Sequence, residues 1–165
     1  MAIFAKNSLY QISGFDNPII SGELVYNQKT FWNLVMTTGG CDGVPITPID
    51  LTGATITAQI IRRRLENVKD TRYGLSFDVF DYTPTPSPVN LTITNRDDTA
   101  GLFTLVIDES AWGVLSTDPG LDISSVNGVG FSGRILISFP ANGQTPAQDT
   151  VIFLFFIIRS DGVVN

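Results

Sequence analysis

Apolar and polar residues alternate along several short stretches of this chain, most regularly between residues 50 and 64. Ala54, Ile56, Ala58 and Ile60 in this stretch are apolar and share one parity. The residues between them are polar, and this period of two is typical of a strand with one buried face. Asp50 and Gly53 precede the alternation and favour a sharp turn. The pattern therefore predicts a turn followed by a half-buried strand.

Other apolar runs are also of strand length. They lie at residues 23–38, 91–94, 102–107, 133–139 and 150–159. We expect 91–94 to form a hairpin with 102–107, and 133–139 to pair with 150–159. Trp32 is predicted to be a core anchor, and only residues 108–115 have helical character. The predicted fold is all-β, an antiparallel immunoglobulin-like β-sandwich.

The run from Val151 to Ile158 is apolar on both parities. It is eight residues long, which suits a buried strand and is too short for a membrane helix. We expect this strand to be covered on both faces. One cover is the partner sheet, and the other is either the N-terminal segment or a neighbouring subunit.

The sequence divides into an arm at residues 1–22 and a β-sandwich domain at residues 23–165. The arm mixes turn-forming residues with apolar ones, the latter including Ile3, Phe4, Tyr10, Phe15, Ile19 and Ile20. Such a segment needs covering, either by its own domain or by a neighbour. Arg62, Arg63 and Arg64 end the strand described above, and form either a solvated strand end or a grip on a carboxylate-rich partner. These nine residues are the interface candidates.

Charge and cysteine content exclude several partners. The net charge is −6, which opposes broad attraction to nucleic acid or to anionic membranes. Cys41 is the single cysteine, so neither an intrachain disulfide nor a thiolate metal cluster is expected. The first 20 residues do not match a secretory signal, so we expect synthesis and assembly in a reducing cytoplasm.

The sequence contains no histidine, which removes the commonest general base and metal ligand. Paired carboxylates remain the possible catalytic groups, and the candidates are Asp78, Asp81, Asp97, Asp98, Asp108 and Glu109. Most of them stand beside turns, where acids satisfy backbone donors. Asp97 and Asp98 lack the remaining ligands of a calcium loop, and Cys41 lacks a histidine partner. We predict no enzyme activity, metal, cofactor or small-molecule substrate.

The order of these features resembles the N-terminal immunoglobulin-like domain of bacteriophage upper baseplate proteins and related small virion proteins. The residues that carry the resemblance are 48–53 leading into Ile60 and Arg62, 100–105, Trp112 with Leu115, and 134–139 with 151–159. It spans about residues 23–160, while the arm and an insertion at 67–88 depart from the family pattern.

The resemblance implies a virion structural protein, in the tail or baseplate, that contacts other virion proteins and forms homo-oligomers. A capsid decoration protein is the alternative. A carbohydrate-binding module is a further one, and would need exposed aromatic residues such as Tyr73 and Tyr82 in one groove.

Overall fold

A computed structural model describes residues 9–13, 18–38, 45–64, 68–69, 78–79, 82–121, 123, 128–144 and 146–160. The strands and helix are β1 (Leu9–Ser13), β2 (Ile19–Val25), β3 (Thr30–Thr38), β4 (Thr47–Pro48), β5 (Thr55–Arg64), β6 (Val68–Lys69), β7 (Asp78–Val79), β8 (Tyr82–Asp97), β9 (Leu102–Ile107), α1 (Glu109–Leu115), β10 (Val129–Phe139) and β11 (Gln148–Arg159). The all-β prediction is confirmed.

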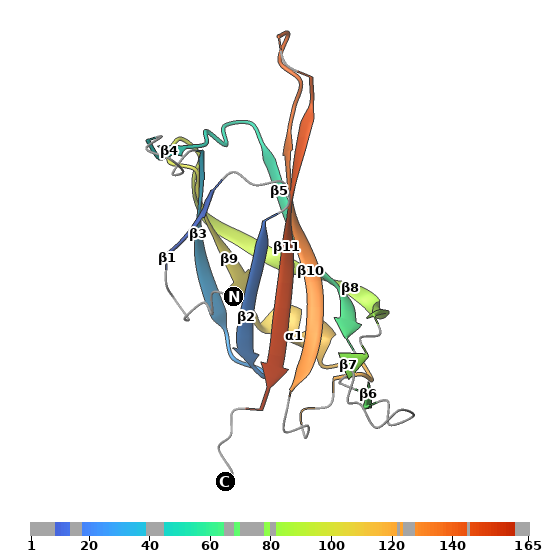
Figure 1. The fold of residues 1–165 in the computed structure, drawn as a ribbon. Coiled ribbons are helices and arrows are strands. Elements are labelled where there is room, and N and C mark those ends of the chain that lie inside the picture. Colours follow the sequence, from blue (N-terminus) through green and yellow to red (C-terminus); the bar gives the residue numbers. More distant parts are fainter. Residues whose placement is uncertain are drawn as a thin grey trace.

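Nine of the described strands form one sheet that curls into two facing layers (Figure 1). Its order is β1-β3-β9-β8-β5-β10-β11-β2, with β4 beside β3, while β6 and β7 form a separate small sheet. The second half of β8 pairs with β9, and its first half pairs with β5. Because β8 belongs to both layers, the two layers of the sandwich are hydrogen-bonded parts of one continuous sheet.

The predicted antiparallel pairing holds for the six strands from β3 to β11 in this order. The two outer pairs differ, since β1 runs parallel to β3 and β2 runs parallel to β11. The chain enters one layer with β1, crosses to the other with β2 and returns with β3. Two reversals give β1 and β3 the same direction. β2 also crosses the predicted boundary between arm and domain at residue 23.

The core lies between the layers and contains the residues that the alternation of β5 assigns to the buried face. Trp32 of β3 packs against Phe156 of β11, with 4.8 Å between ring centroids. This contact joins the layers directly, as expected for a core anchor. α1 is capped by Asp108 and buries Trp112, whose indole Nε1 donates to the carbonyl of Gln28 at 2.9 Å. No helix in the described part of the chain is long and apolar enough to cross a membrane.

A β-bulge interrupts β5. Its pairing with β10 shifts between Ser132 and Gly133, and its pairing with β8 shifts between Ile60 and Arg62. Ile61 is therefore the extra residue relative to β10, whereas on the other side it lies opposite the longer β8 segment between Pro84 and Val89. Gly133 faces the bulge so closely that an added Cβ would overlap the carbonyl group of Gln59. The bulge thus depends on a glycine in the neighbouring strand.

Replacing Gly133 by alanine is expected to destabilise the protein by about 1–3 kcal/mol, because the new methyl group has no space beside Gln59. Gly113→Ala is the matched control, since Gly113 lies in α1 with open space around its Cβ position. This second change should instead stabilise the protein by about 0.5–1 kcal/mol. Urea unfolding of both variants measures the difference. Equal effects of the two substitutions would contradict this account of the bulge.

Candidate interaction surface

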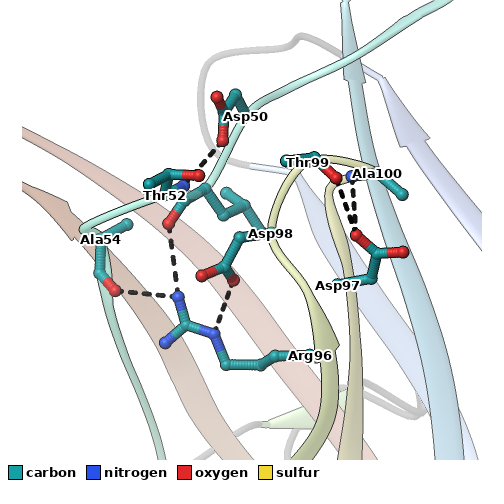
Figure 2. Close-up of polar contacts among 9 residues, drawn as sticks. Asp50, Thr52, Ala54, Arg96, Asp97, Asp98, Thr99 and Ala100 are labelled. Carbon is teal, nitrogen blue, oxygen red and sulfur yellow. Dashed lines mark hydrogen bonds and ion pairs between the residues drawn. The ribbon is translucent and has the colours of Figure 1, made fainter.

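The Asp-Leu-Thr-Gly stretch at residues 50–53 is held by Arg96 of β8 (Figure 2). The guanidinium Nη2 donates to the carbonyls of Leu51 at 3.3 Å and Ala54 at 3.0 Å. Its Nε donates to the carboxylate of Asp98 at 2.8 Å. We call this set of contacts the Arg96 clasp. It fixes the point at which the chain leaves the β3–β9 layer and enters β5.

Backbone contacts reinforce the Arg96 clasp. The amide of Leu51 donates to the carbonyl of Asp98, and the amide of Met36 donates to the carbonyl of Gly101, each at 2.9 Å. Gly101 has a φ of +64°, and a side chain there would overlap the carbonyls of Met36 and Ile49. Leu51 itself is completely buried. The motif that carries the sequence resemblance is therefore used to build the sandwich.

The acidic residues that were candidate catalytic groups, where described, stabilise turns and the start of the helix. The Asp97 carboxylate accepts from the Thr99 hydroxyl at 3.0 Å and the Ala100 amide at 3.2 Å. Asp98 belongs to the Arg96 clasp, and Glu109 lies exposed in the first turn of α1. The described residues contain no group of three or more potential metal-ligating side chains. Asp78 is described only as backbone in β7, and Asp81 and Cys41 lie outside the described residues.

Asp108 makes the most contacts of these acids. Its carboxylate accepts from the hydroxyls of Ser110 at 2.6 Å and Thr92 at 2.8 Å, and from the Ala111 amide at 3.1 Å. The hydrogen bonds from Ser110 and Thr92 lower the pKa of Asp108 from 3.8 to about 2. Asp108 is thus a helix cap that stays ionised at neutral pH, whereas a general acid must hold a proton there.

The three adjacent arginines separate because of the bulge at Ile61. Simple alternation would place Arg62 on the buried face with Ile60, but the extra residue reverses the parity. Arg62 is exposed, while Arg63 turns inward and forms an ion pair with the buried carboxylate of Asp118. The Arg64 backbone pairs with Tyr82 and Gly130, and its side chain is not described. Within this set, Arg62 is the described side chain that faces outward.

The apolar interface candidates of the N-terminal arm also differ in their exposure and in how far they are described. Ile19 is 67% exposed at the start of β2, whereas the next residue, Ile20, is 1% exposed and belongs to the core. Tyr10 lies in β1 opposite Leu34, and only its backbone is described. Ile3, Phe4 and Phe15 lie outside the described residues, as does Tyr73; Tyr82 is described only as backbone. The part of the arm that is described forms edge strands on the same chain.

A groove crosses the outer face of β2, β11, β10 and β5. The first three of these strands lie side by side in Figure 1. The volume of the groove is about 480 Å³, and its lining includes Ile19, Phe153, Arg134, Ser132 and Arg62. Phe153 is 45% exposed although it sits in the middle of β11. β11 was expected to be covered on both faces, and at Phe153 the outer face is open in the described structure. Sequence reasoning identified Ile19 and Arg62, but missed Phe153 and Arg134.

The register explains how the groove arises. Ile19, Phe153 and Arg134 are successive partners across β2, β11 and β10, so their side chains form one row on the outer face. The next row places the small Ser132 between Phe155 and Arg62. A small residue between larger ones leaves a depression. Neither Arg62 nor Arg134 has an ion pair with another described residue.

No protein-family model matches this sequence, and no curated protein matches it. Among solved structures, the chain is similar to one described as the N-terminal domain of phage TP901-1 ORF48. The sequences are 9% identical, the match covers 92% of this chain and 97% of that chain, and the TM-score is 0.42. At this identity and TM-score, the likeness carries no argument about function.

Asp108→Ala should lower the free energy of unfolding by about 1 kcal/mol at neutral pH, because α1 loses its N-cap. The wild-type protein should also lose stability as pH falls from about 4 towards 2, since the pKa of Asp108 is lower in the folded state than in the unfolded state. Asp108→Asn keeps a capping side chain but removes the ionisation. Urea unfolding as a function of pH should show a weaker acid dependence for this variant; an unchanged profile would refute the assignment.

Arg63→Ala should destabilise the protein by about 3 kcal/mol, because it leaves the buried carboxylate of Asp118 without its cation. Arg62→Ala is the matched control on the adjacent residue. Arg62 is exposed, so its loss should change stability by no more than about 0.5 kcal/mol. Thermal and urea unfolding distinguish the two. Similar losses from both variants would mean that the bulge does not separate the roles of these arginines.

Proposed function

We propose that this protein is a non-enzymatic structural subunit of a bacteriophage virion, located in the tail or baseplate. The observation that favours binding over catalysis is the open groove containing Ile19, Phe153, Arg62 and Arg134. It combines exposed apolar surface with cations that have no described ion-pair partner. Surfaces of this composition are typical of protein contact sites.

The roles of the carboxylates support the same conclusion. Asp97 and Asp98 order the turn between β8 and β9, and Asp108 caps α1. None of the three is aimed into the groove lining. A glycosidase needs two carboxyl groups that face one substrate, whereas these carboxylates are occupied by backbone and side-chain donors of their own turns.

The virion assignment rests on the sequence resemblance to upper baseplate domains. The Arg96 clasp gives that resemblance a physical basis, because Leu51 bonds to Arg96 and Asp98, and Gly101 lies against the backbone of Ile49. The expected partners are other virion proteins and further copies of this chain around a symmetry axis.

Quantitative mass spectrometry of purified virions tests the location. A tail or baseplate subunit should occur in roughly three or six copies, or a small multiple, because such assemblies follow rotational symmetry. A capsid decoration protein should instead approach the copy number of the major capsid protein. Tail sheath or tube proteins of known copy number provide the internal control. Absence of the protein from purified particles would refute a virion role, and near-parity with the capsid protein would reassign it to the head.

A further inference from the structure

The outer groove is built to hold a particular kind of partner. Ile19 and Phe153 provide apolar surface at one end, while Arg134 and Arg62 come from β10 and β5 at the other. Four strands at about 4.8 Å spacing span about 14 Å. An extended peptide rises about 3.3 Å per residue, so about four residues cross the groove. Its size thus fits a short segment better than the face of a whole domain, which needs about 800 Å² per partner.

The charges in the groove indicate which chemical class of partner it binds. The chain has a net charge of −6, yet the charged residues that line this groove are both arginines. A guanidinium group pairs well with a carboxylate. By contrast, Lys29 on the opposite layer lies 5.4 Å from the ring centroid of the exposed Phe31. The two exposed apolar surfaces differ in form, since Phe31 has one cation over its own ring, whereas Phe153 lies in a groove that two arginines line.

A symmetric contact with a second copy fits these charges poorly. In a two-fold contact the same patch lies on both sides. Arg62 and Arg134 would then lie near the same residues of the other copy, and like charges placed together oppose association. The arrangement favours a partner that brings carboxylates of its own.

We propose that this groove binds an extended segment of a partner protein in which one large apolar side chain is followed, at alternate positions, by carboxylates. The apolar side chain packs on Ile19 and Phe153, and the carboxylates pair with Arg134 and Arg62. The inference deepens the proposed function by giving the chemistry of a partner in the virion. Its physical basis is the groove alone, so it can be tested without the virus.

The probes are the synthetic peptide Ser-Phe-Ser-Glu-Ser-Glu and its versions with Leu or Trp in place of Phe, in which alternate side chains face the groove. The controls are the same three peptides with Lys in place of each Glu. They are titrated to about 5 mM into the ¹⁵N-labelled full chain. The acidic peptides should shift the amide resonances of Ser132, Arg134 and Phe153. These shifts should be smaller at high salt, because salt screens the attraction between carboxylates and arginines. The lysine peptides should leave these resonances unchanged.

Variants locate the binding. Phe153→Ser and Arg134→Glu should each raise the dissociation constant at least about tenfold, which corresponds to 1.4 kcal/mol. The matched controls are Ile46→Ser and Lys29→Glu, which change an exposed apolar residue and an exposed cation outside the groove. They should bind as the wild type does. Because Phe153 and Arg134 are exposed, both groove variants should remain folded, and their amide spectra verify this.

Three results would overturn the proposal. The first is the absence of shifts at these amides with all acidic peptides, and the second is equal binding of acidic and lysine peptides. The third is self-association of the wild type, measured by light scattering, that Phe153→Ser abolishes, since it would assign the groove to a second copy. If the protein binds the acidic peptides but is absent from purified virions, only the proposed function is refuted. If the protein is present in virions but its groove binds none of the peptides, only this inference is refuted.

Discussion

The hydrogen bonds from Arg96 to the carbonyls of Leu51 and Ala54 are the contacts on which the two-layer arrangement most depends. These carbonyls belong to the segment that crosses from one layer to the other. The carbonyl of Leu51 also accepts from the amide of Ala54 at 2.9 Å, so Arg96 reinforces a turn that the backbone itself begins. A charged donor provides strong hydrogen bonds there. Because β5 is central in its layer, with β8 on one side and β10 on the other, the position of this crossing sets the register of both neighbours.

The bulge at Ile61 then determines how the sheet presents its charges. One extra residue sends Arg63 inward to Asp118 and leaves Arg62 outward beside the groove. Without the bulge, strict alternation of side chains would point Arg62 towards the core and Arg63 towards solvent. The same local irregularity therefore contributes to the interior, through the ion pair, and to the outer surface, through the groove.

Much of the fold follows from local sequence patterns, and the exceptions are non-local. Alternation identified the buried residues of β5, the pairing of β10 with β11 and the helical character around Trp112, because each depends on nearby residues. It did not predict that β1 runs parallel to β3 or that β2 runs parallel to β11, because these pairings depend on how strands meet that are not neighbours in sequence. The inward turn of Arg63 was missed because the bulge requires Gly133 on a different strand. Ile19 and Arg62 were found as exposed candidates, whereas Phe153 looked like another core residue in a fully apolar run.

The parallel pairing of β2 with β11 also has a kinetic consequence. It joins residues far apart in the chain, as shown by the ion pair between Glu23 and Arg159, which are 136 positions apart. Such long-range pairing slows folding, since a large loop must close before the contacts form. On the ribosome, β2 has to wait without its partner until β11 has been synthesised. The groove needs Ile19 from one strand and Phe153 from the other, so it forms only after β11 has been synthesised. Any protein that recognises it therefore distinguishes chains in which β2 and β11 have paired from chains in which they have not.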